Sequence, residues 1–263
     1  MTVADNRGMR VTIVGCSGSF AGPSSPASSY LVQADDGERT WNVLLDLGSG
    51  ALGALQRHLD PAAVDALFLS HLHPDHCSDV TGLYVTRKYR PEGELTVPLP
   101  VFGPKDTADQ LVRMYHGASP DEVARHFEVT SVEDGAVVEV GPFRITPYAV
   151  NHPVEAYGYR VEAGGRVLAF TGDTDSCDAL GGLLGGADLA LMDAAFVEGR
   201  DETRGIHLTA ARAAQAALDA GGVERLMLTH LPPWNDPETA RAEAAAVWTG
   251  EVELADPDAT YDV

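Results

Sequence analysis

Three histidines and one aspartate fall within six consecutive residues of the segment 70–76, SHLHPDH. They are His71, His73, Asp75 and His76, and they directly follow the apolar residues 66–69, which indicate a buried strand. Imidazole nitrogen and carboxylate oxygen are ligand types that suit zinc and related divalent ions. Because a strand end can bring such side chains together locally, we interpret the segment as part of a metal site rather than as a solvated turn.

Three further metal-capable residues each follow an apolar stretch that is typical of a strand. They are His152 in AVNHP, Asp173 in AFTGDTD and His230 in LMLTH. A lone histidine after a strand is more often structural than a ligand, but loops at one edge of a sheet commonly carry functional residues on a rigid scaffold. Together with segment 70–76, the pattern predicts that these side chains converge at one sheet edge.

Apolar periodicity predicts strands and helices that alternate along the chain. The expected strands cover residues 10–14, 28–34, 41–46, 66–70, 136–140, 143–150, 157–163, 166–172, 188–193, 225–229 and 251–255. The expected helices cover residues 51–59, 78–90, 105–116, 119–127, 209–220 and 237–248, with one more short helix after residue 172. No Pro/Gly/Ser-rich linker interrupts them, so the pattern predicts one layered α/β domain over residues 1–263. The helical positions of His58, His116 and His126 suggest surface or packing roles.

The chain is strongly acidic. It has 263 residues, of which 18 are Lys or Arg and 39 are Asp or Glu, so the formal net charge is −21. Nucleic-acid binding normally depends on clustered Lys and Arg, and the longest basic cluster here, TRKYR at 86–90, is small. This charge argues against a polyanionic partner.

Neither a membrane span nor an export signal is expected. No segment approaches the ~18 consecutive apolar residues that a membrane-spanning helix requires, and the apolar run VTIVG near the N-terminus is shorter than the core of a secretory signal. The cysteines Cys16, Cys77 and Cys177 are too few and too scattered for a disulfide framework. We therefore expect a cytoplasmic protein without membrane contact.

The order HxHxDH, then His, then Asp, then His resembles the metallo-β-lactamase superfamily, and the resemblance covers nearly the whole chain. It implies a four-layered αβ/βα sandwich that binds two divalent metal ions. It also implies that one ion is held by His71, His73 and His152 and the other by Asp75, His76 and His230. Asp173 would bridge the two ions, and Asp46 in LLDLGSG matches an early aspartate that orients ligands from behind. From the residues alone, Asp46 is equally a turn residue before Gly48.

Two details narrow the resemblance to the tRNase Z-like branch. Position 173 is Asp, whereas many true β-lactamases carry Cys there, which disfavours β-lactamase activity. The segment GIHLT at 205–209 resembles that branch's GHST/GHLT element, and DAAF at 193–196 resembles its EATF, with Asp193 replacing Glu. The resemblance implies that His207 contacts the scissile phosphate and protonates the leaving group, with Asp75 as a second catalytic residue. The structural alternative for His207 is an exposed residue near a helix-capping Thr209.

The substrate is expected to be small and anionic. Only twenty residues separate His152 from Asp173, and they contain nothing like the basic arm with which tRNA-processing relatives grip tRNA, so tRNA is not an expected partner. The segments 14–32, 177–180 and 228–234 resemble bacterial phosphodiesterases of this branch that act on cyclic nucleotides such as cAMP. A tRNA 3′-processing endonuclease is the alternative, followed by a lactonase, thioesterase or arylsulfatase on the same metals.

Some features stay open at this stage. Zinc is the first choice for the two ions, with manganese or iron as alternatives, because first-row ions compete by availability as well as geometry. A homodimer is possible, since relatives are often dimers. The Ser/Gly-rich loop 17–29 either lines the mouth of the pocket or is a plain surface loop.

Overall fold

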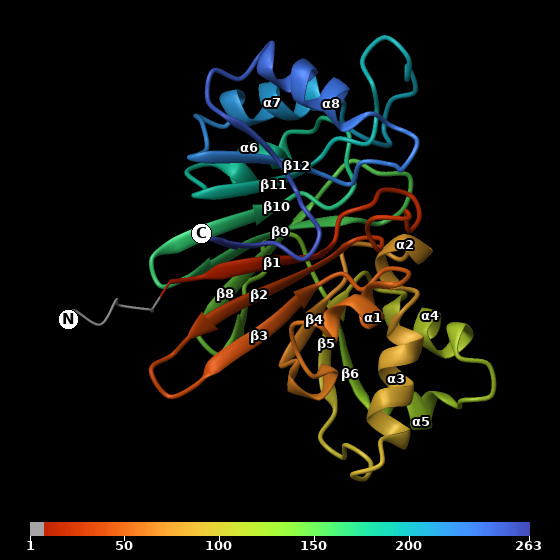
Figure 1. Cartoon of the computed structure of the whole chain (residues 1–263). Helices are drawn as coiled ribbons and strands as arrows, with labels where there is room; N and C mark the ends of the chain where they lie inside the picture. Colours follow the sequence, from red (N-terminus) through yellow and green to blue (C-terminus); the bar gives the residue numbers. More distant parts are fainter. Residues whose placement is uncertain (1–7) are drawn as a thin grey trace.

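Two β-sheets form the centre of the molecule, and the computed structural model describes residues 8–263 (Figure 1). Each sheet has seven strands in the described part of the chain. The first sheet has the order β14-β1-β2-β3-β4-β5-β6 and the second the order β13-β12-β11-β10-β9-β8-β7. The described N-terminal half therefore forms most of one sheet and the C-terminal half most of the other.

The strands of the first sheet are β1 (Arg10–Gly15), β2 (Ser29–Asp35), β3 (Thr40–Leu45), β4 (Ala66–Phe68), β5 (Leu99–Gly103), β6 (Phe127–Ser131) and β14 (Thr260–Asp262). Those of the second sheet are β7 (Val138–Val140), β8 (Phe143–Ala149), β9 (Tyr157–Ala163), β10 (Arg166–Phe170), β11 (Leu189–Asp193), β12 (Arg225–Thr229) and β13 (Val252–Leu254). Strands β3 to β6 run parallel, as do β10 to β13.

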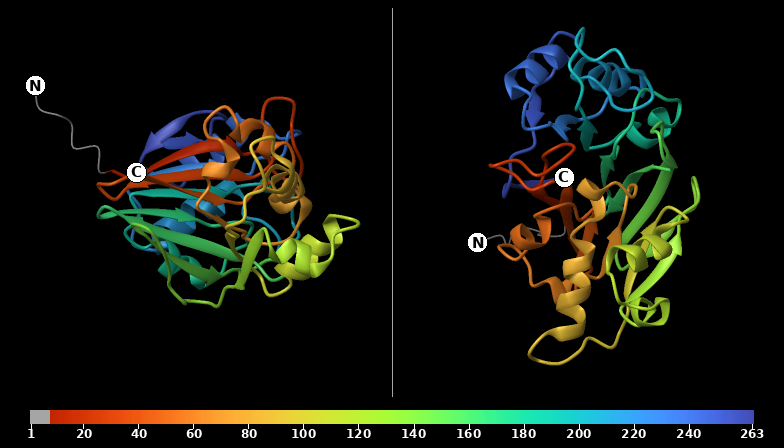
Figure 2. Two further views of the ribbon diagram at one scale, coloured as in Figure 1. Left: turned by 90° about the horizontal axis from the view of Figure 1, so that it is seen from below. Right: turned by 90° about the vertical axis from the view of Figure 1, so that its right-hand side faces the viewer.

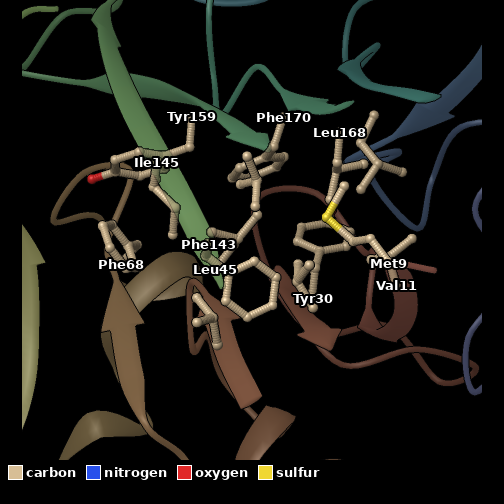
Figure 3. Packing of buried hydrophobic residues seen from close by; sticks show 14 of the residues in the cluster. Met9, Val11, Tyr30, Leu45, Phe68, Phe143, Ile145, Tyr159, Leu168 and Phe170 are labelled. Carbon is tan, nitrogen blue, oxygen red and sulfur yellow. The ribbon is translucent and has the colours of Figure 1, made fainter. Parts of the chain in front are cut away.

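The two sheets face each other across a shared hydrophobic core. Successive side chains of a strand point to opposite faces of a sheet. In β3, Val43 and Leu45 enter the core between the sheets, while Leu44 faces the outer helices. In the second sheet, Phe143 and Phe170 enter the same core, and Figure 3 shows their rings among residues of the first sheet. The period-2 pattern of these strands therefore serves two cores at once.

Helices cover the outer face of each sheet (Figure 2). On the first sheet these are α1 (Ala51–Leu55), α2 (Pro74–Cys77), α3 (Val80–Tyr89), α4 (Thr107–Met114) and α5 (Pro120–Ala124), with the 3-10 helix η1 at Pro61–Ala63. On the second sheet they are α6 (Ala179–Leu184), α7 (Ala210–Asp219) and α8 (Pro237–Ala245). Separate apolar clusters join each set of helices to its sheet. The layers therefore run helix, sheet, sheet, helix, which confirms the expected αβ/βα sandwich.

The residues at the two ends of α7 determine where this helix begins and ends, and its N-terminal end lies next to the site. The Thr209 side chain accepts a hydrogen bond from the backbone N–H of Arg212 and caps the helix. Small buried alanines on one face, such as Ala213 and Ala217, let the helix approach the sheet closely. Gly221 follows with a φ of 91°, a left-handed conformation that glycine adopts without strain. The capping residue Thr209 thus lies two residues after His207, and the helix begins at Ala210.

Several expected elements needed correction. The sequence patterns did not indicate β5, β6 or β14. Strand β5 contains Pro100, which argues against a strand by pattern, yet pairs in parallel with β4 and β6. The helix expected over 119–127 ends at Ala124, because Phe127 already pairs with Leu99 in the sheet. The helix expected over 51–59 is shorter, at Ala51–Leu55.

The carboxyl ends of the parallel strands lie at one edge of the two sheets. In open α/β sheets, ligands commonly bind in the crevice outside the carboxyl ends of the strands. Within residues 8–263, no helix combines the length and apolar character that crossing a membrane requires.

Candidate metal centre

The segment after β4 turns sharply and presents its side chains back toward the sheets. His73 is the residue before α2, with extended backbone, and Pro74 occupies the first helical position, where its fixed φ suits a helix start. Asp75 and His76 lie in the single turn that follows, and both are buried. The spacing HxHxDH is thus a strand end, a proline-initiated turn and a short helix in succession.

The structure brings together all seven residues that the sequence suggested as metal ligands. They form two groups, and within each group the donor atoms lie within 4.8 Å of one another. The first group is His71, His73 and His152, and the second is Asp75, His76, Asp173 and His230. In the first group, the Nδ1 of His73 lies 2.9 Å from the Nε2 of His71 and 3.2 Å from the Nε2 of His152. These nitrogens converge on one point from two loops, the one after β4 and the one after β8.

Asp173 lies between the two groups. Its Oδ2 is 3.6 Å from the Nε2 of His71 and 3.3 Å from the Nε2 of His230, and its Oδ1 is 3.2 Å from the Nε2 of His76. One carboxylate therefore contacts histidines of both groups. This is the geometry expected of a bridging ligand.

The donor set fits divalent metal ions. The Nε2 of His76 and the Oδ1 of Asp173 lie 3.2 Å apart without the geometry of a hydrogen bond, and both are buried with no other hydrogen-bond partner among the described residues. Such orphaned polar atoms are rare in proteins unless an ion or another group satisfies them. The site supplies imidazole nitrogen and carboxylate oxygen and no thiolate. This combination suits zinc, manganese and iron alike.

Burial sets the protonation of these ligands. It lowers the pKa of His71, His73 and His152, so these imidazoles are neutral and available as ligands. Burial by itself would raise the pKa of Asp173, but the neighbouring His230 and the other histidines hold it well below its usual value. The Asp173 carboxylate is therefore ionised.

Asp46 supports the centre from behind, as expected from the resemblance. Its Oδ2 lies 2.7 Å from the Nδ1 of His76, which leaves the Nε2 of that ring facing Asp173. The backbone N–H and the hydroxyl of Ser70 also donate to Asp46, at 2.7 and 2.9 Å. Asp46 is fully buried and adopts a φ of 60°, so it is a constrained residue rather than a free turn aspartate. Such partners fix the tautomer and orientation of a metal-binding histidine.

His152 is oriented in the same way by the chain. Its Nδ1–H donates to the carbonyl of Ile206 at 2.9 Å, which leaves Nε2 for the centre. This bond links the loop of His152 to the residue next to His207.

His207 stands beside the metal-ligand cluster and is paired with Asp193. The Nδ1 of His207 lies 2.9 Å from the Oδ2 of Asp193 and 3.9 Å from the Oδ2 of Asp173. Asp193 is fully buried and also accepts hydrogen bonds from the backbone N–H groups of Thr174 and Ala195. Burial lowers the pKa of His207, but the charge and the hydrogen bond of Asp193, together with the charge of Asp173, outweigh burial and raise the pKa to about 9. His207 is buried, so the exposed position considered from sequence is wrong.

One functional arrangement was missed by the sequence analysis. The carboxylate of Asp175 is 1% exposed and is bound by Arg204 at 2.6 Å, by Arg212 and by the backbone N–H of Gly205 at 2.7 Å. The backbone N–H of Asp175 donates to Asn151, which precedes His152. Asp175 therefore joins the loops that carry Asp173, His152 and His207. Asp175 is the second aspartate of GDTDS at 172–176, but its partners lie about thirty residues further along the chain, so no local sequence pattern indicated the contact.

The remaining histidines lie outside the cluster. His58 is half-buried and its Nε2 lies 2.8 Å from Asp258, whereas His116 is exposed. His126 is fully buried beneath Tyr84, with Nε2 3.3 Å from Glu94. The surface or packing roles expected for these residues agree with their positions.

A pocket of about 670 Å³ lies next to the centre rather than over it. It is lined by Ser17 and residues 22–25 of the loop after β1, by Leu231 and Pro233, and by the C-terminal stretch near Asp256. The neighbours of His230 on both sides, Thr229 and Leu231, contribute to its wall. Part of loop 17–29 thus lines a pocket, although not the metal-ligand cluster itself.

Comparison with known proteins places the chain in a family. A family described as "Beta-lactamase superfamily domain" matches residues 41–231. An uncharacterized protein of Mycobacterium leprae is 42% identical over 97% of this chain and 89% of its own length. The probable metallo-hydrolase YhfI of Bacillus subtilis is 30% identical over 94% of this chain and 97% of its own length.

Two further comparisons extend this result. The crystal structure of YhfI, described as a metallo-beta-lactamase fold protein, superposes with a TM-score of 0.86, covering 97% of this chain and 100% of that one at 28% identity. A ribonuclease Z of Mycobacterium bovis is 27% identical over 94% of this chain and 95% of its own length. With the His/Asp cluster at the sheet edge, these similarities show that the chain belongs to the beta-lactamase superfamily, as a metal-dependent hydrolase with the metallo-β-lactamase fold.

Proposed function

We propose that this protein is a phosphodiesterase that hydrolyses a small phosphodiester, with a 3′,5′-cyclic nucleotide such as cAMP as its substrate. The observation that carries the proposal is the pair of His207 and Asp193, 2.9 Å apart beside the seven-residue cluster. A histidine held in this way suits protonation of an alkoxide leaving group, a step that the thiolate of a thioester does not need.

The proposed centre holds two ions, with zinc as the first choice and manganese or iron as alternatives. One ion would be held by His71, His73 and His152, the other by Asp75, His76 and His230, with Asp173 shared. Two divalent ions, when bound, supply a Lewis-acidic centre that acidifies water and attracts an anionic substrate.

Three side chains would position the reactants and transfer the proton, namely His207, Asp193 and Asp75. His207 donates a proton to the leaving 3′ oxygen of the nucleotide, and Asp193 holds the imidazole ring in position for that donation. Asp75 lies 3.4 Å from the Nε2 of His76 and retains slight solvent exposure, so its carboxylate can accept a hydrogen bond from the attacking water and orient it. Attack on phosphorus and departure of the 3′ oxygen give a 5′-monophosphate.

Charge and shape favour a small substrate over a long one. The net charge of −21 repels a polyanion, whereas a cyclic nucleotide brings a single negative charge. The segment between His152 and Asp173 consists of the hairpin of β9 and β10, which turns at Gly164 and Gly165. That hairpin leaves no insertion of the kind that would grip tRNA.

A tRNA 3′-processing endonuclease is the second candidate. It is favoured by the similarity to the ribonuclease Z of Mycobacterium bovis, which extends over 94% of this chain. The acidic charge and the short hairpin count against it.

Localisation and domain organisation are part of the same proposal. The three cysteines are free, as expected in a reducing compartment, so we place the protein in the cytoplasm. Both sheets supply residues to one centre, so we treat residues 1–263 as one hydrolase domain.

A substrate panel tests the proposal. Cyclic nucleotides, bis(p-nitrophenyl) phosphate, a pre-tRNA, a lactone, a thioester and an aryl sulfate are offered to one metal-loaded preparation. We expect turnover of the cyclic nucleotides and of bis(p-nitrophenyl) phosphate. Activity on the thioester, lactone or aryl sulfate alone would reject both phosphodiesterase assignments.

A further inference from the structure

Two exposed aromatic rings meet close to the metal-ligand cluster. Phe20, in the loop between β1 and β2, and Trp234, in the loop after β12, have ring centroids 5.0 Å apart at an interplanar angle of 44°. Their exposed fractions are 43% and 64%. Among residues 8–263, this is the aromatic ring contact in which both partners are exposed. Single exposed apolar side chains are normal, but a contiguous apolar patch commonly marks a binding site.

The Phe20 loop contacts His230, and Trp234 belongs to the loop that carries His230. The backbone nitrogen of Ser19 lies 3.4 Å from the Nε2 of His230. Phe20 is the next residue, so its Cα lies no more than about 9 Å from that nitrogen. Gly18 packs so tightly on His230 that an added Cβ would lie 2.2 Å from the His230 carbonyl oxygen. Trp234 follows four residues later, and Figure 1 shows the two loops side by side.

The two loops are held in place by hydrogen bonds rather than by the rings themselves. The backbone N–H of Gly18 donates to the carbonyl of Leu231 at 3.1 Å, and the hydroxyl of Ser17 donates to the carbonyl of Phe20 at 2.8 Å. On the other loop, the side-chain amide of Asn235 donates to the carbonyl of Ala195 at 2.8 Å. A surface that is already ordered loses little conformational entropy on binding a ligand.

We propose that Phe20 and Trp234 form an aromatic platform on which the base of the nucleotide substrate stacks while its phosphodiester reaches the metal centre. The inference rests on the proposed function and names the group of the substrate that is recognised outside the centre. Stacking uses the aromatic face of the base and not the charge of the phosphate. An acidic protein can therefore hold the base in this way while the single phosphodiester charge is met at the centre.

Discrimination between substrates with and without a base tests the platform. For each variant, kcat/KM is measured on cAMP and on the 3′,5′-cyclic phosphate of 1-O-methylribose, which keeps the cyclic diester but has neither a base nor another aromatic ring, and the ratio of the two values is compared. Phe20→Ala and Trp234→Ala should each lower the ratio by about 5- to 100-fold, the range that loss of one base–aromatic stack produces. Trp234→Phe keeps a planar ring and should retain most of the ratio.

A matched control is available on α3. Tyr89 is 59% exposed and is the last residue of α3, whereas the 70–76 segment precedes the start of that helix. Tyr89→Ala removes an exposed aromatic ring of similar size and should leave the ratio at the wild-type value.

Binding of adenosine gives a readout that does not depend on catalysis, because adenosine has no diester to cleave. Adenosine should quench part of the tryptophan fluorescence of the metal-loaded protein in a saturable way, whereas ribose 5-phosphate should not. The quench should disappear in Trp234→Ala and persist in Trp248→Phe. Retention of the quench in Trp234→Ala would overturn the platform.

The two sets of results separate this inference from the proposed function. Adenosine quenching through Trp234 without hydrolysis of cyclic nucleotides would keep the platform and reject the function. Hydrolysis of cAMP with an unchanged ratio in both alanine variants would keep the function and reject the platform. A change of oligomeric state in Trp234→Ala, measured by sedimentation, with an unchanged ratio would assign the pair to a subunit contact and also reject the platform.

Discussion

The Nδ1 of His207 lies 2.9 Å from the Oδ2 of Asp193, and both side chains are buried. Asp193 ends β11 and is itself held by two backbone N–H groups, so the histidine is fixed to the sheet and not to a mobile loop. A buried carboxylate on Nδ1 determines which ring nitrogen carries the transferable proton. The function we propose depends on this pair more than on any single ligand.

Replacement of His207 should separate catalysis from metal binding. His207→Ala should retain the metal content of the wild type but lose about 10²–10⁴-fold in kcat on cAMP, since a general acid contributes this much. The loss should be smaller on bis(p-nitrophenyl) phosphate, because p-nitrophenolate leaves without protonation. Equal losses on both substrates would reduce His207 to a positioning residue.

Asp173 should control metal content. Its carboxylate contacts histidines of both groups, at 3.6 Å from His71 and 3.3 Å from His230. Asp173→Ala should therefore lose most of the metal and nearly all activity, as measured by elemental analysis and by turnover after reconstitution. A variant that retains both ions would show that the carboxylate does not bridge them. A wild-type protein that binds no zinc, manganese or iron would contradict the metal centre itself.

Asp46 should affect metal affinity without contacting the metal. It holds the Nδ1 of His76 at 2.7 Å from a fully buried position. Asp46→Asn keeps the shape but removes the charge, and such outer partners typically contribute 10- to 100-fold in metal affinity. Competition with a chelator measures the change. Unaltered affinity would mean that Ser70 and the backbone alone orient His76.

Asp175 should matter for stability as well as for turnover. Asp175→Asn leaves Arg204 and Arg212 without their charged, buried partner, which should lower the free energy of unfolding by about 1–3 kcal/mol. The loss should fall in the lower part of this range, because Arg204 is largely exposed to solvent. The matched control is Asp258→Asn, because Asp258 pairs with Arg57 at the surface, where ion pairs contribute at most about 1 kcal/mol. Urea unfolding of both variants tests the difference. Equal midpoints for the two variants would contradict the bridging role of Asp175 among the site loops.

The residue pattern predicted a layered α/β domain with metal-capable side chains at one sheet edge, whereas the four-layered sandwich and the division of the ligands between two ions were implied by the family resemblance. Buried strands are read directly from apolar runs such as 66–69, and metal-capable residues that follow such strands can meet at one edge of the sheets, as His152 does although it follows the antiparallel strand β8. His71, His152 and His230 were therefore placed correctly from sequence, although they are distant along the chain.

Other features depend on contacts that no local pattern records. Strand β5 contains Pro100, and its pairing is determined by the neighbouring parallel strands and not by its own propensity. The bonds from Arg204 to Asp175 and the ring contact of Phe20 with Trp234 arise only when separate loops fold together. The position and the burial of His207 became known only from the structure. From the sequence, its role as a proton donor was supported by the family resemblance alone.

Product analysis on two substrates tests the central claim most directly. The metal-loaded protein is given 3′,5′-cAMP and a pre-tRNA side by side at moderate salt, and products are separated and identified. We predict that cAMP is converted to 5′-AMP and that its turnover exceeds cleavage of the pre-tRNA, because one negative charge is neutralised by the centre while a long phosphate backbone is repelled by the acidic chain. Efficient 3′ trimming of the pre-tRNA without any release of 5′-AMP would contradict the account and establish the endonuclease instead.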